Sequence, residues 1–124
     1  MKKFLLYLTL FIALVSFAPG SIPDIIKALK TGNAHETASY FDNTVEITLP
    51  DKSTSANKQQ AEAILQNFFK DNPVKDFKVL HQSKNASSEY CIGTLATANG
   101  VFRTTIYTKE KNGNALIQEL RFEK

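Results

Sequence analysis

The chain of 124 residues contains one cysteine, no tryptophan and two histidines. A single cysteine excludes an intramolecular disulfide framework and a cysteine-rich metal site. His35 and His81 are not spaced as a ligand pair on one helix and have no cysteine close by, so neither a metal site nor a cofactor is expected. The chain also has no internal repeat and no low-complexity segment. Its length suits one domain and excludes a multidomain enzyme.

The chain also lacks a large excess of positive or negative side chains. The chain has 15 Lys and Arg residues against 12 Asp and Glu residues, a net charge of +3. Basic and acidic side chains alternate in its second half, and no basic track is interleaved with aromatic residues. Nucleic-acid binding is therefore not expected.

Long hydrophobic runs are absent except for one at the start. Lys2 and Lys3 precede the uncharged run Phe4–Phe17, which the helix-breaking pair Pro19 and Gly20 follows. A basic start, a short apolar run and small residues are typical of a secretory signal peptide. A membrane anchor is the alternative, but the run is shorter than the roughly 20 apolar residues that span a bilayer.

The small residues around this run allow two cleavage points, after Ala18 or after Gly20. Cleavage after Ala18 would leave Pro19 at the new N-terminus, so cleavage after Gly20 is preferred. We therefore expect a signal peptide at 1–20 and an exported, periplasmic or extracellular domain at 21–124. Removing both N-terminal lysines lowers the net charge to +1.

Apolar periodicity and capping residues predict three helices and five strands in the exported part. Each helix follows a hydroxyl or amide residue that can cap its first turn, and the strands are rich in β-branched and aromatic residues. Asn99-Gly100 and Asn112-Gly113 predict hairpin turns, because both residue types tolerate positive φ. The fold class is therefore α+β. The expected helices lie at 21–31, 33–41 and 57–71, the strands at 43–49, 74–84, 89–98, 101–111 and 114–123, and a polar loop at 51–56.

The order helix, helix, strand, helix and four meandering strands resembles the nuclear transport factor 2-like (cystatin-like) fold. The resemblance is carried by the segments IPDIIKALKTGNAHETASYFDNTVEITL, QQAEAILQNFFKDNP, FKVLHQS and YCIGTLATANGVFRTTIYTKEKNGNALIQELRFEK. At this level the chain is similar to domain of unknown function 4783, a family of small exported bacterial proteins. The resemblance implies a cone in which N-terminal helices pack on a curved antiparallel sheet. It implies no activity, because the family has no established one and the fold hosts many functions.

The best-known enzymes on this fold, ketosteroid isomerases, pair an Asp base on the first strand with an acidic tyrosine. The stretch Tyr40–Glu46 looks similar, but Ile47 occupies the position of the base. Asp42 and Glu46 are interpreted as a loop cap and a solvent-facing strand charge. Cys91 is interpreted as a small core residue, the alternative being a thiolate activated by His81. No catalytic residue is assigned.

Two-residue turns would divide the last three strands into two apolar faces. The first contains Tyr90, Tyr107 and Gln118, together with Leu120 and Phe122, and we expect the helices to cover it. On this assignment the polar tips of the first face could line the mouth of a pocket for a small apolar ligand, or be satisfied core groups. The second face would then form a homodimer interface. The candidate ligand-binding residues are His81, Tyr90, Tyr107 and Gln118.

The leading hypothesis is an exported, non-enzymatic binding or protein-interaction module with an apolar pocket. The alternative is a small-molecule enzyme of isomerase, dehydratase or hydrolase type that uses the same pocket. An enzyme needs a buried Asp, Glu or His that faces the cavity and has a hydrogen-bonding partner, whereas a binding module needs only shape and a few donors.

Overall fold

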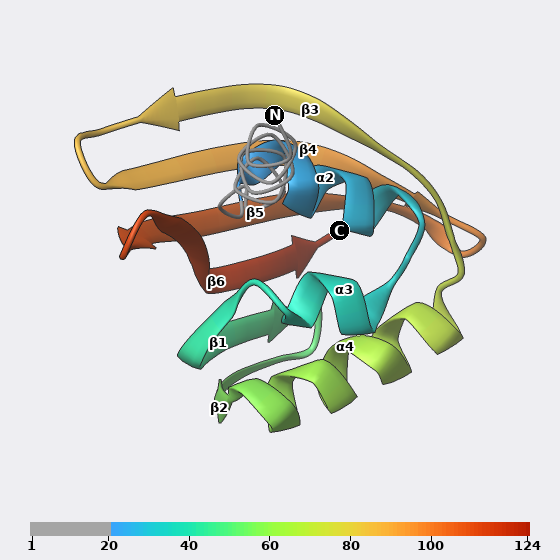
Figure 1. Ribbon diagram of the computed structural model, residues 1–124. Helices are drawn as coiled ribbons and strands as arrows, with labels where there is room; N and C mark the ends of the chain where they lie inside the picture. The colour runs from blue at the N-terminus through green and yellow to red at the C-terminus, as the bar shows by residue number, and fades with distance from the viewer. Residues whose placement is uncertain (1–20) are drawn as a thin grey trace, which may run out of the picture.

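A computed structural model describes residues 21–124, which form three helices and six strands. The expected signal peptide at 1–20 lies outside the described residues. Figure 1 shows the helices on one side of a curved sheet, and we call the helix-covered side the inner face and the opposite side the outer face. The elements are α2 (Ile22–Lys30), α3 (Ala34–Ala38), β1 (Phe41–Leu49), β2 (Lys52–Asn57), α4 (Lys58–Asp71), β3 (Val74–Lys84), β4 (Ser88–Thr97), β5 (Gly100–Lys111) and β6 (Asn114–Glu123).

Each helix begins directly after its expected capping residue, but Ser21 makes no capping hydrogen bond and donates instead to the Asp24 carboxylate at 2.9 Å. The side chain of Asn33 accepts a hydrogen bond from the backbone N–H of Glu36 at the start of α3. At the start of α4, Asn57 and Gln60 form a reciprocal capping box, in which each side chain accepts from the other residue's backbone N–H at 2.8 and 3.2 Å. All three predicted helices and the α+β class are confirmed.

The segment expected to be a polar loop at 51–56 is largely a strand, so that prediction is wrong. β2 pairs antiparallel with β1, with Val45 opposite Ala56 and Glu46 opposite Ser55. The sequence of β2, KSTSAN, has little apolar content, and only Ala56 is buried among its residues. The open edge of β1 supplies the hydrogen-bonding partner that makes this polar segment extended, which local propensity does not reveal.

The sheet has the strand order β2-β1-β6-β5-β4-β3. Both Asn-Gly hairpins are present, because β4 pairs with β5 and β5 pairs with β6, antiparallel in each case. β1 and β6 run parallel, unlike the wholly antiparallel sheet that was expected. The long connection through α4 and four strands allows this, since parallel neighbours need a distant connection.

The inner face of the sheet and the helices enclose an apolar core. Phe68 of α4 stacks on Phe122 of β6 at a ring-centroid distance of 4.7 Å, and it meets Phe102 of β5 edge-on at 5.2 Å. Leu65, from the same helix, is completely buried. Large side chains therefore fill the space between helix and sheet, where the face assignment from the sequence suggested a pocket.

The helices cover the opposite face of β4 and β5 from the one expected. Cys91, Leu95 and Ile106 are completely buried beneath them, whereas Tyr90 lies on the outer face with 45% of its surface exposed. Gly93 explains part of this arrangement, because a Cβ there would lie 2.5 Å from the ring of Phe77. The missing side chain lets the Phe77 ring lie against β4 on the inner side.

Candidate functional site

Three of the four expected ligand-binding residues lie on the outer face of the sheet. Tyr90 and Tyr107 are directly opposite each other on β4 and β5, and their rings stack at a centroid distance of 4.5 Å. His81 pairs with Ile92 on the same face. Among residues 21–124 no helix covers this face, so the tyrosine pair is a platform open to solvent.

Gln118, the fourth expected residue, occupies a bulge in β6. Thr108 pairs with Ile117 and Tyr107 pairs with Glu119, which leaves Gln118 without a partner residue on β5. The bulge reverses the alternation, so Ile117 and Leu120 both face inward. The prediction from the sequence placed Gln118 on the same face as Tyr107, because it assumed an unbroken ladder of strand pairing after the Asn112-Gly113 turn.

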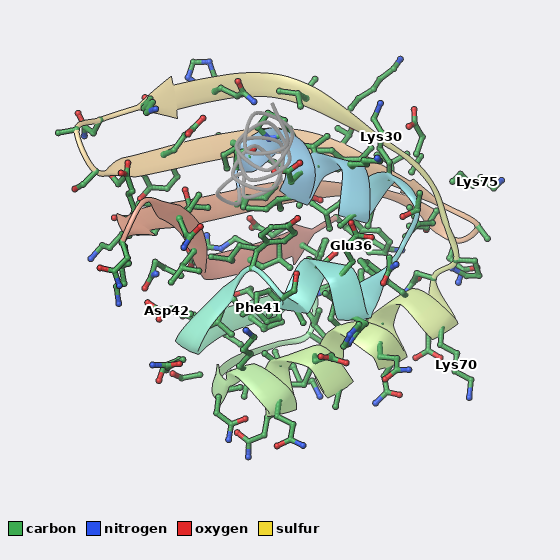
Figure 2. The ribbon with its side chains drawn as sticks, in the orientation of Figure 1. Lys30, Glu36, Phe41, Asp42, Lys70 and Lys75 are labelled. Carbon is green, nitrogen blue, oxygen red and sulfur yellow. The ribbon has the colours of Figure 1, made fainter. Side chains whose placement is uncertain are left out.

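The Gln118 bulge lies opposite a stretch of β1 in which the register shifts between Phe41 and Glu46. There Gln118 contacts the carboxylate of Asp42. The side-chain amide of Gln118 donates to Oδ2 of Asp42 at 2.9 Å, and the ammonium of Lys111 donates to the same oxygen at 2.6 Å. The Asp42 side chain is only 10% exposed. Figure 2 shows Phe41 toward the middle of the molecule and Asp42 at its edge.

The hydrogen bond from Lys111, followed by that from Gln118, lowers the pKa of Asp42 to about 2. Asp42 does accept a local bond from the backbone N–H of Asn43, as a loop cap would, but the ion pair with Lys111 was missed. The two partners are 69 residues apart, and the charged residues of the sequence give no signal that would pair them. A carboxylate with such a low pKa is a weak base.

The remaining chemical candidates lie in packed or separated positions. Ile47 and Cys91 are buried core residues, and burial raises the pKa of the Cys91 thiol. His81 faces outward and Cys91 inward from neighbouring strands, so the structure does not bring this pair together. Within residues 21–124, no group of three or more His, Cys, Asp or Glu side chains could hold a metal ion.

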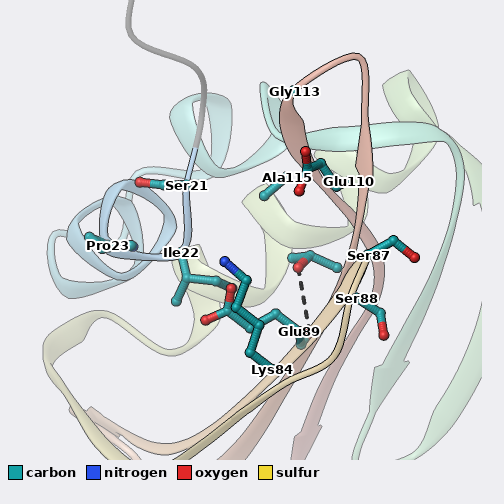
Figure 3. Close-up of a pocket in the computed structure, with 11 residues that line it drawn as sticks. Ser21, Ile22, Pro23, Lys84, Ser87, Ser88, Glu89, Glu110, Gly113 and Ala115 are labelled. Carbon is teal, nitrogen blue, oxygen red and sulfur yellow. Dashed lines mark hydrogen bonds between the residues drawn. The ribbon is translucent and has the colours of Figure 1, made fainter.

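Two clefts open at the ends of the inner face. The first, of about 370 Å³, lies between the start of α2 and the ends of the β3–β4 and β5–β6 hairpins. In Figure 3, Lys84 and Glu89 project toward Ile22 in this cleft, and the hydroxyl of Thr108 bonds to the carbonyl of Glu89. The second, of about 410 Å³, lies between α4, the β1–β2 turn and the start of β5. None of the four expected ligand-binding residues lines either cleft.

Charge on the outer face is divided between its two halves. The half formed by β3, β4 and β5 carries three cationic side chains and one carboxylate, besides the Lys111 that pairs with Asp42. The half formed by β1 and β6 carries three carboxylates and one cation, Arg121, which bonds to Glu119 at 3.2 Å. The register places Lys78, Arg103, Lys109 and Asp76 in the first half and Glu46, Glu119, Glu123 and Arg121 in the second.

No helix in residues 21–124 is both long enough and apolar enough to cross a membrane. None of the curated proteins compared with the chain matches it. Among solved structures, the chain is similar to an NTF2-like protein of unknown function from Cytophaga hutchinsonii, with a TM-score of 0.58 and 12% identity over 82% of this chain and 83% of that one. At this identity the likeness shows the nuclear transport factor 2-like fold alone.

Two further structures are much more similar in sequence. A DUF4783 family protein from Bacteroides ovatus is 36% identical, with a TM-score of 0.81 over 86% of this chain and 97% of that one. A DUF4783 family protein from Bacteroides uniformis is 34% identical, with the same TM-score over 85% and 97%. The family model described as domain of unknown function (DUF4783) matches residues 22–123. The chain therefore belongs to the DUF4783 family, and its fold is nuclear transport factor 2-like.

Proposed function

We propose that this chain is an exported, non-enzymatic interaction module whose working surface is the outer face of its sheet. The observation that carries the proposal is the stacked pair Tyr90 and Tyr107, which lies open on a sheet face that no described element covers. Aromatic residues on an open surface are typical of interfaces, because they bury a large area at a small cost in conformational entropy. Large side chains fill the core between α4 and the sheet.

The partner of this face is a second copy of the chain. A two-fold axis through the outer face would set the cationic half of one copy against the acidic half of the other, and the same pairing would occur twice. Opposite charges around an aromatic centre favour such docking and fix its orientation. Ile92 and Leu116 extend the apolar centre beside the tyrosines.

The enzyme alternative receives less support from the geometry. Asp42 is the one Asp or Glu among residues 21–124 that is buried, and its pKa is lowered to about 2. A general base for proton abstraction works best with a pKa near the operating pH. The ion pair with Lys111 therefore favours a structural role for Asp42, in which it links β1 to β5, over a role as a general base.

The oligomeric state of the protein in solution tests the proposal. Protein purified after expression of the full chain is expected to be a dimer by light scattering at micromolar concentration. Tyr90→Lys, which places a charge at the centre of the face, is expected to weaken dimerisation at least tenfold. Gln66→Lys adds the same charge to an exposed position on α4, at the opposite side of the molecule, and is expected to leave the dimer unchanged. A strict monomer at 100 µM or above would overturn the homodimer.

Charge reversal tests how the copies are oriented. Arg103→Glu or Glu46→Lys alone would place like charges across the two-fold interface and weaken dimerisation. The double variant reverses both halves and is expected to recover much of the loss. If the two effects simply add, the two halves do not face each other and the proposed orientation is wrong.

Export is tested by the intact mass of the protein recovered from the periplasm or the medium. Cleavage after Gly20 predicts the mass of Ser21–Lys124. A mass that still includes residues 1–20 would contradict a cleaved signal peptide and favour the membrane-anchor alternative.

A further inference from the structure

The second cleft has an aromatic floor. Phe68 and Phe102 form its base, with their rings edge to face at 5.2 Å, and Ile64 and Leu49 add apolar walls. Its volume of about 410 Å³ is within the range of small-molecule sites. The cleft lies on the inner side of the sheet, so an occupant would not compete with a partner on the outer face.

One cation already lies over this floor. The ammonium of Lys124 is 5.5 Å from the centroid of the Phe102 ring. A cation at this distance is attracted by the negative face of the ring. The Lys124 side chain is exposed and makes no ion pair among the described residues, so it can leave the ring at little cost.

The charges at the rim favour another cation in that place. Asp51 and Asp71 line the cleft together with Lys52 and Lys124, and none of these four side chains is in an ion pair among residues 21–124. A ligand cation that displaces the Lys124 ammonium would keep two positive and two negative groups around the cleft. An anionic ligand would leave an uncompensated negative charge beside Asp51 and Asp71.

We propose that this cleft binds a small organic cation, a primary or quaternary ammonium with an apolar body, over the Phe102 ring. The apolar body lies against Ile64 and Phe68, and the carboxylates of Asp51 and Asp71 balance the ligand's charge. Lys124 is the internal competitor, whose side chain must swing away before the ligand can bind. The site therefore selects for positive charge and size, and not for a particular hydrogen-bonding pattern.

The test uses benzyltrimethylammonium as the probe and the protein purified after expression of the full chain. Chemical shifts of the Phe and Ile side chains are followed during titration to 20 mM. Saturable shifts confined to the second cleft are expected. The neutral isostere neopentylbenzene, compared up to its solubility limit, and the anion phenylacetate are expected to bind at least fivefold more weakly. No saturation by 20 mM, or equal affinity for the neutral or anionic probe, would overturn the proposal.

Two exposed substitutions test the assigned roles without disturbing the core. Lys124→Met removes the competing ammonium and is expected to tighten binding two- to fivefold. Asp71→Asn removes a balancing charge and is expected to weaken binding by a similar factor, while Asp76→Asn on β3 is the matched control and changes nothing. Looser binding in Lys124→Met would contradict the competitor role. Repeating the titration in Tyr90→Lys separates this site from the outer face, because the affinity should not depend on dimerisation.

Discussion

Both faces of the sheet carry apolar residues, but the kinds of side chain differ. The side chains of Cys91, Leu95 and Ile106 on the inner face have no polar group that needs water, and all are completely buried. The outer face presents Tyr90 and Arg103 from the same two strands, each with an apolar stem and a polar end. Such side chains cover surface while keeping their polar ends solvated. On these two strands, large side chains with polar ends therefore mark the exposed face.

The largest expected difference between the faces is the loss of stability when one apolar side chain is truncated to alanine. Phe122 is fully buried and stacks on Phe68, so Phe122→Ala is expected to lower the free energy of unfolding by about 3–5 kcal/mol. Val101 on the outer face is 58% exposed, and Val101→Ala is expected to cost less than about 0.5 kcal/mol. Urea unfolding at several protein concentrations measures both, and equal losses would contradict the assignment of the faces.

A smaller loss of stability is expected when a side chain is added at Gly93 on the inner face. Its added Cβ would lie 2.4 Å from the carbonyl oxygen of Lys78 and 2.5 Å from the Phe77 ring. Gly93→Ala is therefore expected to destabilise the fold by about 1–3 kcal/mol, the usual cost of overpacking. Ala96→Gly, on the outer face of the same strand, is the control and removes a methyl group without a clash. If thermal unfolding of Gly93→Ala matches the wild type, Phe77 does not lie against β4 as described.

The sequence predicted most of the elements because their signals are local. The Asn57–Gln60 capping box and the Asn99-Gly100 turn each depend on residues a few positions apart, and both appear as expected. The β2 strand, the Gln118 bulge and the Asp42–Lys111 pair depend on contacts between distant segments, so no local pattern could reveal them. The assignment of the covered face was wrong on register, since one unpaired residue in β6 changes which side chains face inward.

The ion pair of Asp42 gives the fold a pH dependence. The pKa of Asp42 is about 2 in the folded chain and near 3.8 when unperturbed, so the folded state binds fewer protons. Its stabilisation is fully present above about pH 5 and is lost as the pH falls through 3.8 toward 2. Because Lys111 is half exposed, solvent screening limits the gain to about 1 kcal/mol.

Asp42→Asn tests this dependence. The variant is expected to be less stable than the wild type by about 1 kcal/mol at pH 7, with the difference shrinking as the pH approaches 2. Asp51→Asn, at an exposed residue that makes no ion pair among residues 21–124, is the matched control and should show no such trend. Urea unfolding between pH 2.5 and 7 measures the effect, and a difference that is constant over this range would argue against the ion pair.

The tyrosine platform is expected to make a small contribution to the stability of the monomer. Tyr90→Ala removes a half-exposed ring and its stack on Tyr107, which is expected to cost about 0.5–1.5 kcal/mol when unfolding is measured below the dimerisation range. At higher concentration the loss should grow, because a partner that binds only the folded state adds stability by mass action. Phe122→Ala should show a loss that depends little on concentration. If the Tyr90→Ala loss is also independent of concentration, the tyrosines stabilise the sheet alone and the outer face has no partner in a second copy.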